Sequence, residues 1–168
     1  LHLYGHSFPT RRSSDLPENL KHMKKEVTYS LGYLLDRTLW ALSNSLNVAL
    51  KNEGIDLPHS QYLVLRTLFE KDGLSQNEIA AHLHKDAAAI KRTVDYLEQK
   101  GLVVRKTVAH SKYNVFLTEK SLSLQSKIML IVDKVFSNAL INVSEDMVNI
   151  SIQVLETIYK SSINKNIK

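Results

Sequence analysis

Residues 74–118 read LSQNEIAAHLHKDAAAIKRTVDYLEQKGLVVRKTVAHSKYNVFLT, and this stretch decides the fold of the chain. It predicts two short helices joined by a tight turn and followed by a β-hairpin. Ser75 is a good N-cap for the first helix, and Glu78 three residues later completes a capping box. Asp86 caps the second helix, and Gly101 ends it as a glycine just past the last turn. The buried stripe of the second helix recurs at spacings of three, four and three residues: Ala87, Ile90, Val94 and Leu97.

A hairpin follows the second helix. Residues 102–104 begin one strand, and Tyr113, Val115 and Leu117 alternate on the returning strand. A helix, a turn, a second helix and a two-stranded wing form an arrangement that lays one helix in the major groove of DNA.

Positive charge collects on the same stretch. Residues 85–112 carry seven Lys and Arg residues and three acidic residues, a net charge of +4. Residues 1–22 supply one of the five net positive charges of the chain, so the rest of the body is neutral. This excess predicts a polyanionic partner, double-stranded DNA. The alternative is a basic surface that is only solvated.

The first residues differ from the rest. Residues 7–16, SFPTRRSSDL, resemble one reading frame of a common sequencing-adapter oligonucleotide and show no helical or strand period. We therefore interpret residues 1–22 as an artefactual or disordered tail and expect native sequence to begin near Pro17 or at Met23. The alternative is a genuine disordered basic arm that enters a minor groove.

Composition excludes several classes of protein. Roughly 145 residues follow the tail, enough for one domain with a substantial core. The chain has no Cys, which excludes disulfides, iron–sulfur clusters and thiol chemistry. No window approaches a membrane span of uninterrupted apolar residues, so we expect a soluble, cytoplasmic protein with no membrane partner.

No enzyme or metal motif is visible. The sequence contains no Gly-rich phosphate loop, HExxH or GxSxG, and no paired-carboxylate spacing with an obvious partner. His59, His82, His84 and His110 lack the spacing of a zinc site. We expect no catalytic residue, no metal and no cofactor.

Long apolar helices flank the central motif. The expected fold is mainly α with a small β-wing, a single domain over residues 23–168. Its winged helix-turn-helix lies at about 57–118, and dimerisation helices lie at about 24–51 and 119–164, with a break at 142–144. Residues 128–132 are apolar on every side of the expected helix, which one chain cannot bury completely. We therefore expect a second copy of the chain to cover this surface in a dimer. In the alternative, the first and last helices pack only on each other.

From about Leu31 to Ser121 the chain resembles the MarR family of bacterial transcription regulators. The resemblance rests on strings in matching order and spacing: Gly54-Ile55-Asp56-Leu57 with Gln61 and Val64-Leu65, Leu74-Ser75-Gln76 with Glu78-Ile79-Ala80, Leu83-His84-Lys85-Asp86, Val94-Asp95 with Leu97-Glu98, Lys100-Gly101-Leu102-Val103 with Arg105, and Leu117-Thr118-Glu119-Lys120. It implies a homodimeric winged-helix regulator, expected to be a repressor, that binds an inverted-repeat operator and responds to a small effector.

Two positions depart from the family pattern. Family members usually carry Asp-x-Arg at the wing tip, where this chain has Ala109 and Ser111, with His110 and Lys112 nearby. Lys lacks the planar fork of Arg, so reading of a narrow minor groove is weakened or replaced. The glycine expected after Leu-Thr-x-Lys is Ser121, which suggests that the wing runs directly into a continuous helix.

The candidate DNA-binding residues lie on the two short helices and the wing: Ser75, Gln76, Lys85, Ala87, Ala88, Lys91, Arg92, Arg105, Lys106, His110, Ser111 and Lys112. Arg92 is the best candidate for a bidentate contact to guanine, and Lys85 for a phosphate contact. The resemblance implies an effector cleft for a small aromatic or amphipathic molecule, with these candidates: Tyr33, Trp40, His59 and Tyr62. In the alternative, these four residues pack in the hydrophobic core and contact no ligand.

Two functions from different classes remain open. The first is a sequence-specific transcription regulator. The alternative is a dimeric winged-helix interaction module without operator specificity, for which the missing wing arginine is the hint.

Overall fold

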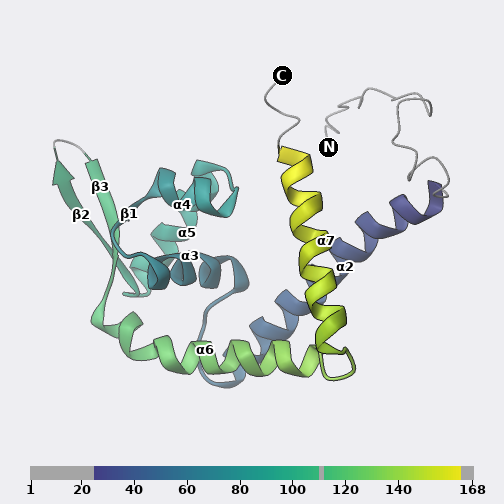
Figure 1. The fold of residues 1–168 in the computed structure, drawn as a ribbon. Coiled ribbons are helices and arrows are strands. Elements are labelled where there is room, and N and C mark those ends of the chain that lie inside the picture. Colours follow the sequence, from purple (N-terminus) through teal and green to yellow (C-terminus); the bar gives the residue numbers. More distant parts are fainter. Residues whose placement is uncertain (1–24, 110–111, 164–168) are drawn as a thin grey trace, which may run out of the picture. The chain divides into compact units, whose positions relative to one another are not determined.

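The computed structural model describes residues 25–109 and 112–163 (Figure 1). The chain divides into two compact units, residues 1–41 and 42–168, and the boundary falls within the first predicted dimerisation helix. The elements in chain order are α2 (Lys25–Asn52), α3 (His59–Glu70), β1 (Leu74–Ser75), α4 (Gln76–Leu83), α5 (Ala87–Gln99), β2 (Val103–Ala109), β3 (Lys112–Leu117), α6 (Glu119–Ala139) and α7 (Glu145–Ile163). This order confirms the predicted fold class. The predicted tail, residues 1–22, lies outside the described residues.

In the first unit, the described residues belong to the N-terminal part of α2. Their large apolar side chains are exposed: Leu31, Tyr33, Leu34, Leu35, Leu39 and Trp40. In the second unit, the C-terminal part of α2 contributes Leu46 and Leu50, which are fully buried.

The start of each short helix agrees with the sequence prediction. The Ser75 hydroxyl accepts from the backbone N–H of Glu78 at 3.3 Å, and the Glu78 carboxylate accepts from the Ser75 N–H at 2.8 Å. The Asp86 carboxylate accepts from the N–H groups of Ala88 and Ala89 at 2.8 and 3.1 Å. These bonds satisfy N–H groups that the first turn of a helix leaves without partners, so both helices begin where the caps lie.

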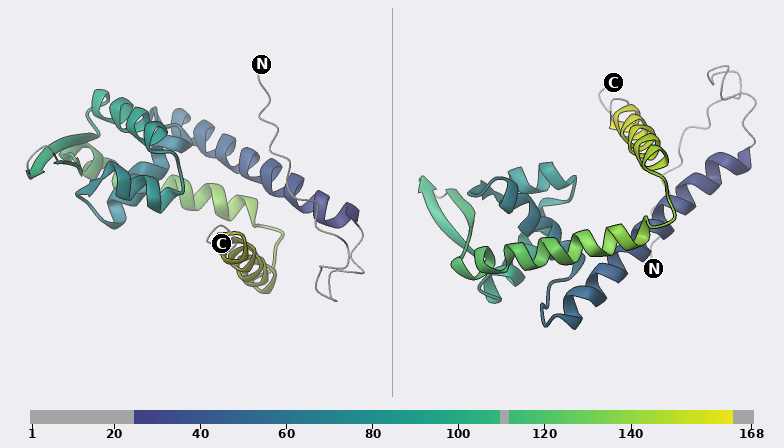
Figure 2. Two further views of the ribbon diagram at one scale, coloured as in Figure 1. Left: turned by 90° about the horizontal axis from the view of Figure 1, so that it is seen from above. Right: turned by 60° about the horizontal axis from the view of Figure 1, so that its bottom comes forward.

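The wing is a three-stranded antiparallel sheet in the order β1-β3-β2. Val103 pairs with Leu117 across the hairpin, and Leu74 pairs with Val115 on the other side. The sequence predicted the two hairpin strands and missed β1, because a strand of two residues shows no alternating period. The hairpin extends away from α3, α4 and α5 in every view (Figure 2).

The core of the second unit lies between the short helices, the sheet and α6. Leu65, Ile79, Ile90, Val94 and Leu97 are buried there, and the partly buried Leu83 packs against this core. Ile90, Val94 and Leu97 belong to the stripe that the sequence predicted. The buried face of α6 consists of Ser121, Ile128 and Val132. We call the part from α3 to β3 the recognition unit. Its core is therefore formed within a single chain.

The last two helices leave much apolar surface uncovered. On α6, Leu130 is 70% exposed, because it lies on the opposite side of the helix from the buried Ile128 and Val132. No residue of α7 is buried among those described, and its exposed apolar side chains are Met147, Ile150, Ile152, Val154, Leu155, Tyr159 and Ile163. The predicted break is present, and Ser144 caps α7 through the N–H of Met147 at 3.3 Å. Tyr159 touches His84, their ring centroids 5.2 Å apart.

No helix in the described ranges is both long and apolar enough to cross a lipid bilayer.

Candidate nucleic-acid interface

The helix α5 has one buried face and one exposed face. Ile90, Val94 and Leu97 face the core, whereas Ala87, Ala88, Lys91 and Arg92 are exposed. The prediction that Ala87 belongs to the buried stripe is therefore wrong, because Ala87 is the first residue of α5 and lies beyond the edge of the core. We call these four exposed residues the recognition face. Small side chains at its start allow the helix backbone to approach base edges closely, and Arg92 extends from the following turn.

The turn between α4 and α5 is tight. His84 has a left-handed backbone with φ 50°, and the N–H of Lys85 donates to the Ala80 carbonyl at 3.0 Å. Lys85 is exposed directly before the Asp86 cap. The Asp86 carboxylate already accepts from the N–H groups of the first turn, so the group here that suits a phosphate is the Lys85 ammonium.

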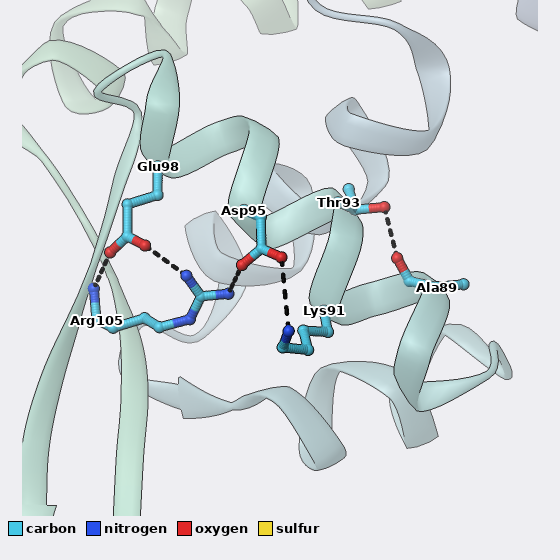
Figure 3. A network of polar contacts seen from close by, with 6 residues as sticks. All are labelled: Ala89, Lys91, Thr93, Asp95, Glu98 and Arg105. Atoms are coloured by element: carbon cyan, nitrogen blue, oxygen red, sulfur yellow. Dashed lines mark hydrogen bonds and ion pairs between the residues drawn. The ribbon is translucent and has the colours of Figure 1, made fainter.

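Arg105 of β2 does not project freely into solvent, since its side chain is only 19% exposed (Figure 3). One arm of its guanidinium pairs with Asp95 at 2.5 Å, and another donates to Glu98. The second oxygen of Glu98 accepts from the backbone N–H of Arg105 at 3.0 Å. Both carboxylates belong to α5, so these bonds join the wing to the recognition helix.

Gln76 of α4 lies beside the same guanidinium. With its amide oxygen turned toward Arg105, it accepts from Nε at 2.7 Å and from Nη2 at 3.1 Å. Two candidate DNA-binding residues therefore contact each other. Ser75, the neighbour of Gln76, is partly exposed and is engaged in the helix cap.

Other basic residues of the motif also have partners within the fold. The ammonium group of Lys100 pairs with Asp56 at 2.7 Å and donates to Gln61 Oε1 at 2.9 Å. Lys106 lies over the ring of Phe116, 5.2 Å from its centroid. The Lys91 ammonium lies 4.0 Å from Asp95 and is exposed (Figure 3). The net charge read from the sequence does not distinguish cations with partners inside the fold from cations that are free to meet DNA.

The tip of the wing is described only in part. The candidate residues His110 and Ser111 lie outside the described residues. Lys112 pairs with Ala109 at the end of the hairpin, and its side chain is likewise outside the description.

The four effector candidates fall in both units. Tyr33 and Trp40 belong to the first unit and are 61% and 69% exposed. His59 and Tyr62 belong to α3 in the second unit, with ring centroids 6.2 Å apart. The structure thus brings His59 and Tyr62 together.

The surroundings of His59 and Tyr62 are polar and confined. The Nδ1 atom of His59 is 3.2 Å from the Ser43 hydroxyl, and its backbone N–H donates to Asn47. Burial lowers the pKa of His59, and the charge of Lys85 lowers it further. The Tyr62 hydroxyl is buried, and within the described part of the chain the polar side chain beside it is Arg66. Burial raises the pKa of Tyr62, which the charge of Arg66 partly offsets.

Sequence reasoning missed three residues of this surface. Tyr96 is 55% exposed on α5, four residues after Arg92, a spacing that could have identified it. Asp95 and Glu98 were counted as negative charges, and nothing local indicated that both would meet Arg105.

Comparison with known proteins finds one family that matches the part of the chain that carries this surface. The model of the MarR family matches residues 57–109, which cover α3 to β2. A MarR-family transcriptional regulator from Rhodococcus sp. RHA1 shares the fold with a TM-score of 0.70 and 27% identity, over 80% of this chain and 97% of that one. The chain belongs to the MarR family. This membership confirms the sequence-based recognition of a winged helix-turn-helix transcription regulator family, which is not a family of enzymes.

Two further proteins are similar to this chain. The HTH-type transcriptional regulator TtmR of Methylorubrum extorquens is 35% identical over 74 residues, which are 43% of this chain and 38% of that protein. The match thus covers well under half the length of that curated relative. The structure of CouR from Rhodococcus jostii RHA1, bound to p-coumaroyl-CoA, has a TM-score of 0.67 and 26% identity over 89% of this chain and 95% of that one.

Proposed function

We propose that this MarR-family chain is a sequence-specific DNA-binding transcription regulator that places α5 in the major groove of its operator. The observation that carries the proposal is the recognition face, four exposed residues on a helix whose opposite side is buried in the core. A rigid helix with an exposed Arg and small neighbours suits direct readout of base edges.

The regulator acts as a homodimer on an inverted repeat. Support comes from the apolar surface of α7, which has no buried residue, and from the exposed Leu130 on α6. A second copy covers such surface symmetrically, and two-fold symmetry then places two recognition helices in successive major grooves. Half-site centres are therefore expected about 10 base pairs apart.

The action is that of a repressor released by a small aromatic or amphipathic effector. Support comes from the buried hydroxyl of Tyr62, a polar group beside Arg66 that a hydrogen-bonding ligand would stabilise. CouR, whose structure holds p-coumaroyl-CoA, motivates phenolic compounds as the first class to test. A ligand shifts operator affinity only by its preference between the bound and released conformations, and a tenfold weakening needs about 1.4 kcal/mol.

Arg92→Ala tests the proposed function. DNA from upstream of the gene is used in a mobility-shift assay beside random duplex DNA. The loss on operator DNA is expected to be about 1–3 kcal/mol, with relaxed preference at one base position.

Arg66→Ala is the matched control, because it removes the same charge from α3, where Arg66 pairs with Glu70 at 3.3 Å. The control should leave operator binding near the wild-type value. Equal losses on operator and random DNA for Arg92→Ala would mean that Arg92 is only a phosphate contact.

The second candidate function is a dimeric interaction module without operator specificity. The observation in its favour is that the only arginine between residues 103 and 117 is held by carboxylates of α5. Equal affinity of the wild-type chain for upstream and scrambled DNA would favour this second function.

A further inference from the structure

One guanidinium joins three elements of the winged helix. Arg105 lies on β2, and Asp95 and Glu98 lie on successive turns of α5 (Figure 3). Gln76 lies at the start of α4. A planar fork that meets two carboxylates has a fixed orientation, unlike a single exposed ion pair. We call Arg105, Asp95 and Glu98 the clamp.

The clamp holds backbone as well as side chain. Glu98 accepts from the backbone N–H of Arg105 at 3.0 Å with one oxygen and from the guanidinium with the other. This N–H belongs to β2 near the base of the hairpin, two residues after the strand begins. A change at Arg105 should therefore loosen the attachment of the wing to α5.

The clamp also controls charge beside the recognition face. The side chains of Asp95 and Glu98 are 40% and 38% exposed, on the turns that follow Lys91 and Arg92. Without Arg105, two negative charges would lie close to where phosphates approach, and like charges repel.

We propose that Arg105 is a positioning residue, an inference that rests on the proposed function. Arg105 fixes the wing against α5 and offsets the charge of Asp95 and Glu98. It makes no DNA contact. This assignment replaces the sequence-based expectation that Arg105 binds DNA. DNA contacts of the described wing then fall to Lys106, whose side chain lies over Phe116.

A thermodynamic cycle separates positioning from direct contact. Operator affinity is measured by fluorescence anisotropy for the wild type, Arg105→Gln, Asp95→Asn/Glu98→Gln, and the triple variant. Arg105→Gln should weaken binding about tenfold or more in the wild-type background. In the background without carboxylates, the same change should alter affinity by less than about twofold, because no charge remains to offset. A direct DNA contact would cost the same in both backgrounds, and that result would overturn the proposal.

Arg105→Lys gives a second test of the same claim. Lys can still meet a phosphate as a point charge but lacks the fork that spans two carboxylates. Positioning predicts a loss of affinity for Arg105→Lys, whereas near wild-type affinity would indicate a phosphate contact and contradict the clamp.

Hydrogen exchange tests the clamp without DNA. Amides of β2 and β3 should exchange faster in Arg105→Gln than in the wild type, while amides around the buried Ile128 of α6 keep their protection. Unchanged exchange in the wing would overturn the proposal. If the wild type binds no DNA specifically but the wing exchanges faster in the variant, the proposed function fails and the clamp stands as a structural element.

Discussion

Single residues fix the local geometry around the wing, and Gly73 is the clearest case. Its φ is +74°, and an added Cβ would lie 2.7 Å from Cε1 of Phe116. Gly54 has φ +73° but open space around the same position. The two glycines share a left-handed backbone and differ in the room for a side chain.

Gly54→Ala should therefore cost about 1–2 kcal/mol of unfolding free energy, the penalty of the left-handed backbone alone. Gly73→Ala should cost more, because Phe116 must shift away from its contact with Lys106. Urea denaturation measures both values. Equal costs would show that the Phe116 contact has no energetic consequence.

His59 gives the chain a stability that depends on pH. Burial lowers its pKa below the usual 6.5, so the folded state binds fewer protons than the unfolded state as pH falls below 6.5. The stability contribution is present above about pH 6.5 and is lost as pH falls through the lowered pKa.

His59→Gln should flatten the pH dependence of the urea midpoint between pH 7.5 and about 5. The lowered carboxylate pKa values of Glu53 and Glu78 affect stability only near and below their usual 4.5, outside this window. An unaltered slope in the variant would assign the pH dependence to another group.

At the scale of elements, the sequence predicted the features that depend on residues close together in the chain, such as the starts of the two short helices. Ser75 and Asp86 cap helices through neighbours two or three residues away, so their effect is readable from sequence alone. The strand β1 and the clamp were missed for the opposite reason. Leu74 pairs with Val115, and Arg105 meets residues seven and ten positions earlier on another element.

Removal of α7 should separate dimer formation from folding of the recognition unit. A chain that ends at Asn142 keeps the core around Leu65 and Val94 but loses a helix without any buried residue. We expect aggregation, or a monomer that binds DNA weakly while its circular dichroism retains the remaining helices.

Light scattering of the truncated chain checks this outcome against the full chain at the same concentration. A truncated chain that stays dimeric would place the interface on elements other than α7.

At the scale of the whole molecule, charge predicts the salt dependence of DNA binding. Four lysines are among the candidate DNA-binding residues, Lys85, Lys91, Lys106 and Lys112. With one phosphate contact each, a dimer makes about eight contacts. The slope of log K against log salt concentration should then be near −7. Titrations between about 50 and 200 mM salt measure this slope. A slope close to zero would exclude DNA as the polyanionic partner inferred from the charge distribution.

The most direct test of a dimer that reads DNA through two α5 helices is a hydroxyl-radical footprint on the gene's upstream region. Such a dimer should give two protected segments related by inverted repeat, with centres about 10 base pairs apart. Arg92→Ala should weaken both segments together, because each copy contributes the same helix. A single protected half-site, or uniform protection along the duplex, would contradict a dimer that reads DNA through two α5 helices.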